Sequence, residues 1–203
     1  MQSRCVPCLL ACILYSTTAI GQETVRIEED WELHVLQPDA QIDAPQIAMT
    51  MVPFGNLSDL LFQVDLNHAT SPSFSAGGIQ VRVAFDDDVF DTKRFLEGVR
   101  LTQSSETVSW TQIVQKSADG YYFGVANGAS TSLGSFGGDA SFIHVPNSQT
   151  GVVSLNAYDA NLSLQNSGVT YAGNRVAWLR LKKLRLFNSL GQSAEWTLNS
   201  DVN

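Results

Sequence analysis

The chain has 203 residues with 12 basic and 20 acidic side chains, which give a formal net charge of −8 at pH 7. This acidic balance argues against general nucleic-acid binding, because that activity needs basic surface to displace the counterions of the phosphate backbone. A chain of this length is long enough to bury a hydrophobic core of its own.

Residues 1–21 have the layout of a secretory signal peptide, with Arg4 before a short apolar run and small residues before the polar Gln22. We therefore expect an exported protein, secreted or periplasmic or on the cell surface, with one domain over residues 22–203. The run is too short to span a bilayer and no second long apolar run follows, so we expect no membrane span. All three cysteines lie in this segment, which leaves the exported chain without a disulfide or a thiolate metal ligand.

Strict alternation of apolar and polar residues predicts the first strands of the exported chain. In the first of them Trp31, Leu33 and Val35 share one face, while acidic residues and His34 take the other. Clusters of proline, glycine and asparagine between the strands are typical of turns. The strands predicted in this half of the chain are residues 28–36, 46–52, 60–66 and 78–85.

Three consecutive aspartates, Asp86, Asp87 and Asp88, follow the fourth predicted strand. We expect a turn or loop here, because aspartates are poor strand formers and adjacent like charges repel. Calcium takes carboxylate oxygens as ligands, so Asp86, Asp88 and Asp91 are candidates for a calcium site. The run lacks the alternate spacing and the glycine of a calcium-binding loop, which leaves a solvated loop as the alternative. We predict a short helical turn at residues 94–99, after this acidic segment.

The next stretch predicts a hairpin, with strands over residues 106–115 and 121–125 and a turn at residues 118–120. Residues 127–139 are rich in glycine and serine and show no periodicity, which predicts a long surface loop. Weaker patterns predict further short elements toward the C-terminus. These are strands at residues 152–158, 161–164 and 195–198 and a loop at residues 168–174.

Residues 174–187 carry the clearest pattern and five of the twelve basic residues. On a helix the apolar residues would scatter around the whole circumference, so the segment predicts a strand. Leu179 and Leu181 share one face of such a strand. After Lys182 the phase shifts by one, so that Leu184 continues the apolar face, and such a shift is typical of a β-bulge. If this strand pairs with the first one, its cations would face the acidic side chains of that strand.

The pattern as a whole indicates an all-β fold, in which two antiparallel sheets pack as a sandwich of the jelly-roll type. No internal repeat of fixed period is present, which argues against a propeller or solenoid. The opening of a central strand at residues 77–81 (G-G-I-Q-V) and the charged, apolar terminal strands resemble concanavalin A-like lectin and glucanase sandwiches. The W-E-L-x-V stretch at residues 31–35, followed by Pro38 and Asp39, resembles uncharacterised secreted bacterial proteins. Neither resemblance supplies a function.

Trp178 is the most informative aromatic residue, because it shares a strand face with Arg180. An indole next to a guanidinium can stack on a sugar ring while the cation binds a carboxylate or a sulfate. Tyr122 is also expected to point outward, so Trp178, Arg180 and Tyr122 are the candidate ligand-binding residues. The alternative is that Trp178 is covered by the loop at residues 168–174. The other tryptophans alternate in phase with apolar residues and are expected in the core; they are Trp31, Trp110 and Trp196.

Glu28, Asp30 and Glu32 match the E-x-D-x-E strand of laminarinase-like glycosidases. That resemblance implies a nucleophile, an orienting carboxylate and an acid on one face of the strand. Their place close to the start of the exported chain, with the acidic Glu29 among them, favours a solvated edge strand instead.

Three functional hypotheses follow from these patterns. The leading one is an exported, non-catalytic module that binds polysaccharide, acidic polysaccharide included, with Trp178 and Arg180 in the contact. The second is a structural or adhesive cell-surface protein that binds other proteins. The third is a glycosidase of the concanavalin A-like fold. No cofactor is expected apart from the candidate calcium ion.

Overall fold

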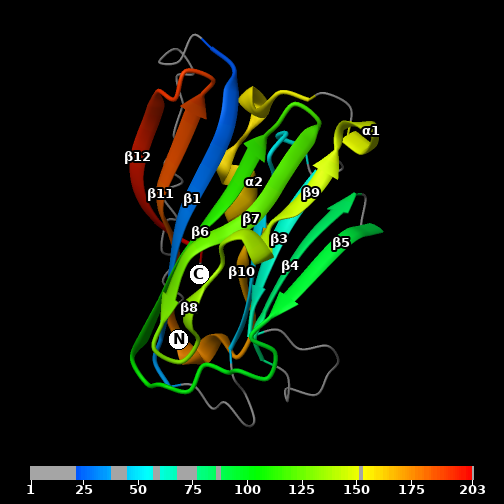
Figure 1. Cartoon of the computed structure of the whole chain (residues 1–203). Helices are drawn as coiled ribbons and strands as arrows, with labels where there is room; N and C mark the ends of the chain where they lie inside the picture. The colour runs from blue at the N-terminus through cyan, green and yellow to red at the C-terminus, as the bar shows by residue number, and fades with distance from the viewer. Residues whose placement is uncertain are drawn as a thin grey trace, which may run out of the picture.

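The computed structural model describes residues 22–37, 45–56, 60–67, 77–85, 88–150 and 153–202. These residues form two antiparallel sheets that pack against each other as two layers (Figure 1). The fold is an all-β sandwich, as predicted, and it is compatible with a jelly-roll-like arrangement. The signal peptide expected at residues 1–21 lies outside the described residues.

The two sheets and the short helical elements are built from the following segments. Sheet A consists of β1 (Thr24–Val35), β6 (Glu106–Lys116), β7 (Gly120–Ser130), β8 (Gly134–Phe136), β9 (Ile143–Pro146), β11 (Val176–Asn188) and β12 (Ser193–Asp201). Its order is β12-β11-β1-β6-β7-β8, and β9 pairs with β7 beside this path. Sheet B consists of β2 (Gln46–Met51), β3 (Leu60–Leu66), β4 (Ile79–Phe85), β5 (Asp88–Phe95) and β10 (Gly168–Tyr171), in the order β10-β2-β3-β4-β5. The helices are α1 (Asn147–Thr150) and α2 (Ala160–Gln165), with 3₁₀ turns at Asp139–Ser141, Leu155–Ala157 and Gly173–Arg175.

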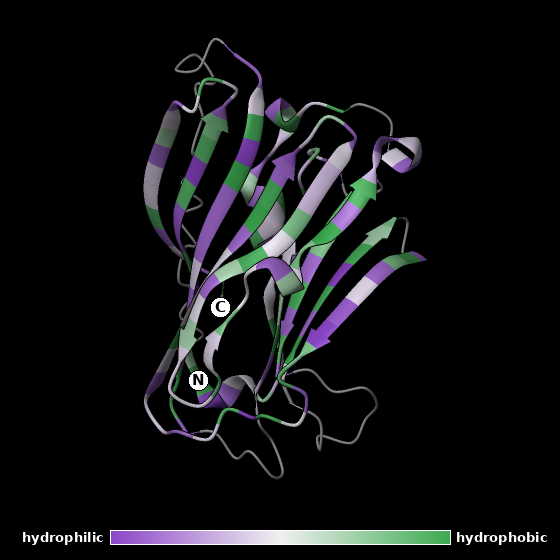
Figure 2. Ribbon diagram, in the orientation of Figure 1, coloured by the Kyte–Doolittle hydropathy of each residue, from purple (hydrophilic) through white to green (hydrophobic). Residues whose placement is uncertain are grey.

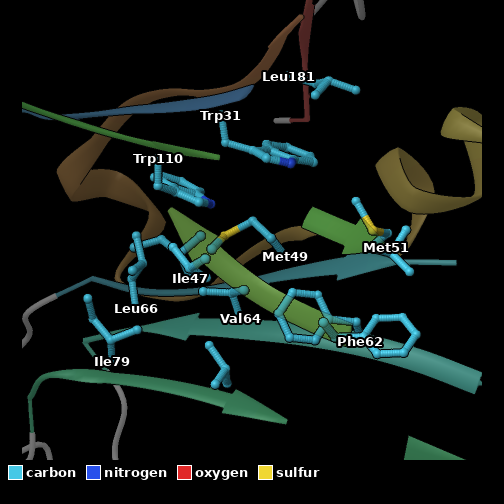
Figure 3. Packing of buried hydrophobic residues seen from close by; sticks show 14 of the residues in the cluster. Trp31, Ile47, Met49, Met51, Phe62, Val64, Leu66, Ile79, Trp110 and Leu181 are labelled. Atoms are coloured by element: carbon cyan, nitrogen blue, oxygen red, sulfur yellow. The ribbon is translucent and has the colours of Figure 1, made fainter. Parts of the chain in front are cut away.

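The inner faces of the two sheets meet in one hydrophobic core. Alternate residues of each strand point into it, and the resulting bands of hydrophobic and hydrophilic residues are visible along the strands in Figure 2. Trp31 and Trp110 stack from adjacent strands with their ring centroids 6.4 Å apart, and Met49 lies on the opposite side of this part of the core (Figure 3). Both tryptophans occupy the core positions predicted for them, whereas Trp196 is only partly buried against it.

The β11 strand has the bulge that its sequence predicts. Asp30 of β1 pairs with Lys183, but the next residue of β1 pairs with Leu181, so Lys182 is the extra residue. The pairing of β11 with β12 is also irregular at this point. Leu181 and Leu184 are both buried, which shows that the extra residue keeps the apolar face of β11 on the core.

The segment at residues 127–139 is not the long loop that its glycines and serines predict. The β7 strand continues to Ser130, and β8 returns alongside it. A Cβ atom on Gly128 would lie 2.2 Å from the ring of Phe136, so the glycine lets this ring lie directly on the strand. A glycine in a strand can therefore mark close packing as well as a loop.

Other local predictions were also wrong. Arg94 and Phe95 end β5, and residues 96–99 form a hydrogen-bonded turn that is not helical, because Leu96 and Gly98 have positive φ angles. Asp88 begins β5 rather than lying in a loop. Residues 155–157 form a 3₁₀ turn and residues 160–165 form α2, where strands were predicted. The side chain of Asp159 accepts a hydrogen bond from the Asn161 backbone amide, and this N-cap favours the helix. The loop predicted at residues 168–174 includes β10, and β9 was not predicted.

Among the residues that the structure describes, no helix is both long and apolar enough to cross a membrane.

Candidate functional site

The candidate site is the outer face of sheet A, which is the face turned away from sheet B. On β1 the buried residues alternate with half-buried ones, so Glu28, Asp30, Glu32 and His34 point outward. The antiparallel register places Glu28 opposite Arg185. The first strand, β1, and the penultimate strand, β11, therefore pair in one sheet, and acidic β1 faces basic β11 as the charges predicted.

Arg185 joins two of the three carboxylates of the E-x-D-x-E stretch. Its Nε lies 2.7 Å from Glu28 Oε2, and its two terminal nitrogens lie 2.7 Å from the two Asp30 oxygens. Burial by itself lowers the pKa of the Arg185 guanidinium, but the hydrogen bonds that it donates to Asp30 and Glu28 more than compensate and raise it. Thr111 Oγ1 also donates to Asp30 Oδ1 at 2.8 Å. In this arrangement the two carboxylates act as ion-pair partners, and most of their acceptor sites are occupied.

The cations that cluster in the sequence of β11 are each paired with a carboxylate of a neighbouring strand. Arg180 lies 2.8 Å from Asp201 of β12. Lys182 lies 3.7 Å from Glu32 of β1. Lys183 lies 2.9 Å from Glu195 of β12. The cluster is therefore largely neutralised in the folded sheet, although it is the most basic part of the sequence.

Trp178 and Arg180 lie together on this face, as the sequence predicts. The Arg180 guanidinium carbon is 4.6 Å from the indole centroid, which is a cation–π contact. His34 of β1 stacks on the same indole at 4.3 Å with an interplanar angle of 11°. The indole nitrogen donates to Glu32 Oε1 at 3.2 Å, and His34 Nδ1 lies 3.0 Å from Thr107 Oγ1. The half-buried indole is thus held in one orientation by its neighbours on the sheet.

Tyr122 points outward from β7, as expected, and 38% of its surface is exposed. Its ring stacks on His144 of β9 with the centroids 4.6 Å apart. Across the sheet, Tyr122 is aligned with Arg26 of β1, because both pair with the same residue of β6, whereas Trp178 pairs directly with His34 of β1. Arg26 and His34 are eight residues apart on β1, which corresponds to about 26 Å along the strand at about 3.3 Å per residue. The structure therefore places Tyr122 at the opposite corner of the face from Trp178.

Two of the three candidate calcium ligands lie on the edge strand of sheet B. Asp88 and Asp91 are exposed on β5, and Asp91 Oδ1 accepts a hydrogen bond from the Thr92 backbone amide at 2.8 Å. Asp86 lies outside the described residues. Within the described ranges, no group of three or more histidine, cysteine, aspartate or glutamate side chains is arranged to hold a metal ion. The calcium site stays a prediction.

Sequence reasoning missed Glu29, which points inward from β1 and is fully buried. Its carboxyl accepts hydrogen bonds from Tyr158 Oη and, at 2.9 Å, from Trp31 Nε1. Burial raises the pKa of Glu29 to about 7, although hydrogen bonds from Tyr158, Trp31 and Ser163 oppose this effect. The signal for this position was present, because Glu29 alternates in phase with the apolar residues of β1.

Gln112 lies directly opposite Glu29 on β6 and is also fully buried. Within the described part of the chain, neither its amide nitrogen nor its amide oxygen has a hydrogen-bond partner. The core therefore contains a small polar region between β1 and β6, which Tyr158 and Ser163 reach from the segment around α2.

No protein-family model matches the chain, and no curated protein matches it. Any functional proposal therefore rests on the fold and on the geometry of its surfaces.

Proposed function

We propose that the protein is an exported, non-catalytic module that binds polysaccharide through the outer face of sheet A, in the manner of concanavalin A-like sandwiches. The observation that carries this proposal is the presence of two aromatic stacks beside polar groups on one outer sheet face. One is the stack of Trp178 with His34 beside Arg180, and the other is the stack of Tyr122 with His144. Aromatic rings held beside polar groups provide both an apolar surface and hydrogen bonds for a sugar ring.

The distance between the two stacks favours a polymer over a small sugar. A separation of about 26 Å along the strands exceeds the reach of a mono- or disaccharide. An extended polysaccharide that crosses the sheet diagonally would contact both stacks, and two linked contacts increase the retention of one chain.

The charges of the face favour a neutral polysaccharide over an acidic one. Arg180 and Lys183 are engaged with acidic residues of β12, so an acidic polymer would compete with carboxylates that are already in place. We therefore expect retention to differ little between low and high salt, because displacement of counterions would contribute little to binding.

The test is retention of the chain from Gln22 onward on a panel of neutral and acidic polysaccharides, with calcium and with chelator. Trp178→Ala and Tyr122→Ala should each weaken retention, and the double variant should abolish it. The matched control is Leu190→Ala, because Leu190 is 66% exposed in the turn between β11 and β12, away from both stacks. Unchanged retention in both single variants would refute the assignment of these residues.

Two further outcomes of this test are informative. Loss of retention with chelator and in Asp91→Asn would support the calcium site. Failure to retain any polysaccharide in either condition would contradict the proposal and favour the alternative of a structural or adhesive protein that binds other proteins.

A further inference from the structure

The outer face of sheet B carries a pocket of about 180 Å³ that is separate from the face of sheet A. Strands β2, β3, β4 and β10 contribute to it. The polar side chains that line it are Gln46, Asp65, Gln80, Arg82 and Thr170. They come from four strands, and no two of them form a recognisable sequence motif.

Small residues lie in register beside the pocket on this sheet. Ala48 of β2 lies in register between Gly168 of β10 and Asp65 of β3. A Cβ atom on Gly168 would have no neighbour within 4 Å, so the space above this strand is open. The polar side chains of β3 and β4 form one wall of the pocket, and Gln46 of β2 and Thr170 of β10 line its other side.

The polar groups of this wall hold one another in position. Asp65 accepts hydrogen bonds from Gln63 Nε2 at 2.5 Å and from Gln80 Nε2 at 3.0 Å. Arg82 Nη2 donates to Gln63 Oε1 at 2.8 Å, and Arg94 Nε donates to Gln80 Oε1 at 2.8 Å. Gln80 is 6% exposed, and both its amide nitrogen and its amide oxygen are hydrogen-bonded within this network. A ligand would meet groups that are already oriented, which lowers the entropic cost of binding.

This network leaves hydrogen-bonding capacity at the pocket. A carboxylate has about four acceptor sites and a guanidinium has five donors. The glutamines use two of the Asp65 acceptor sites, and Arg82 Nε is 3.8 Å from Asp65 Oδ2, which is too far for a hydrogen bond. The Arg82 side chain is 35% exposed, so free donors lie beside free acceptors at the pocket.

We propose that this pocket binds a neutral ligand with adjacent hydroxyl groups, of the size of one sugar ring. One hydroxyl would donate to Asp65 while its neighbour accepts from Arg82, since a hydroxyl does both. An anionic ligand would meet the Asp65 carboxylate and a cationic ligand would meet Arg82, so the pair disfavours either charge. The volume is below the roughly 300 Å³ at which pockets for drug-sized ligands begin, which limits the ligand to a single ring.

The proposal does not depend on polysaccharide binding by sheet A. The two sites lie on opposite outer faces of the sandwich and share no residue. The polymer site would use ring stacking over a long face, whereas this pocket would use a carboxylate and a guanidinium.

The experiment is a titration of the ¹⁵N-labelled chain from Gln22 onward, followed by NMR through the side-chain amide signals of Gln46 and Gln80. The neutral probes are glucose, galactose and mannose, and the charged probes are glucuronate and glucosamine. At least one neutral probe should shift both signals, and the charged probes should shift them less. Asp65→Asn should weaken the neutral probe about tenfold, which corresponds to the loss of a hydrogen bond to a charged group.

Two controls separate the outcomes of this titration. Trp178→Ala should leave the titration unchanged, because that residue belongs to the other face. Gln46→Ala, which removes a lining side chain outside the Asp65 network, should also weaken binding, and it tests the pocket if Asp65→Asn does not fold. The proposal would be overturned if no neutral probe shifted the Gln80 signal, if a charged probe bound more tightly, or if both pocket variants bound as the native chain does.

Discussion

Replacing Glu29 with glutamine should remove a large part of the pH dependence of stability. The folded-state pKa of Glu29 is about 7, against 4.5 for an unperturbed glutamate. Below pH 4.5 the group is protonated in both the folded and the unfolded chain, so burial has no charge cost. Between pH 4.5 and 7 the unfolded chain releases the proton while the folded chain retains it, so the free energy of unfolding falls as pH rises.

The expected size of this effect follows from the two pKa values. A difference of one pKa unit corresponds to about 1.4 kcal/mol, so the loss of stability from this group is about 3 kcal/mol above pH 7. Glu29→Gln presents a neutral amide of similar shape at every pH, so its stability curve should lack this fall. At pH 8 the variant should be at least as stable as the native chain. At pH 4, where Glu29 of the native chain is protonated, the variant should be less stable than the native chain.

Urea unfolding of the native chain and of Glu29→Gln between pH 4 and pH 8 measures this difference. Glu97→Gln is the matched control, because Glu97 is exposed. Tyr158→Phe, which removes one donor to the carboxyl, should lower stability without abolishing the pH dependence. Parallel curves of stability against pH for the native chain and Glu29→Gln would refute the argument that burial raises the pKa of Glu29 in the folded chain.

Two further changes test the packing of sheet A. Arg185→Met should lower the free energy of unfolding by about 2 kcal/mol at neutral pH, because Glu28 and Asp30 would lose their shared cation. In a double-mutant cycle, its combination with Glu28→Gln should cost less than the sum of the single changes, and simple additivity would argue against coupling. Gly124→Ala should lower the free energy of unfolding by about 1–3 kcal/mol, because the new Cβ would lie 2.5 Å from the Phe142 ring. The melting temperature should fall accordingly. An unchanged melting temperature would show that this ring moves aside easily.

The parts of the fold that the sequence predicts are those whose signals are local. Alternation along β11 and the shift of phase at Lys182 are both contained in one strand, and they predict the bulge that the register confirms. Core positions such as Trp31 and Trp110 follow from the same alternation. The pairing of acidic β1 with basic β11 could also be anticipated, because complementary charge on two strands favours their proximity.

The elements that were missed depend on contacts from distant residues or on signals that were given too little weight. The strand at β8 needs the ring of Phe136 to lie over Gly128, which no local pattern reveals. The helix α2 did have a local signal, since Asp159 is a favourable N-cap, but its short apolar pattern resembled that of a strand. Edge strands such as β5 carry exposed, charged residues, and alternation is weak where neither face is fully buried.

The same distinction applies to the candidate sites. Trp178 and Arg180 are two residues apart on one strand, so their contact could be predicted, whereas the partnership of Trp178 with His34 needs the register of β1 and β11. The separation of Tyr122 from Trp178 needs the order of four strands. Side chains that are neighbours on a sheet face come from different strands. Their spacing along the chain therefore depends on the lengths of the strands and of their connections.

The three alternate carboxylates of β1 illustrate how a motif can direct attention to the wrong group. Their spacing matches a catalytic pattern, but the cross-strand register supplies a cation to each of them. Glu29, which only interrupts that pattern, is the carboxyl with the strongly raised pKa. Its position in the apolar phase of the strand could be noticed in the sequence, whereas its partner Tyr158 lies more than a hundred residues away. Alternation thus predicts which carboxyl is buried, and only the tertiary structure shows what makes its burial tolerable.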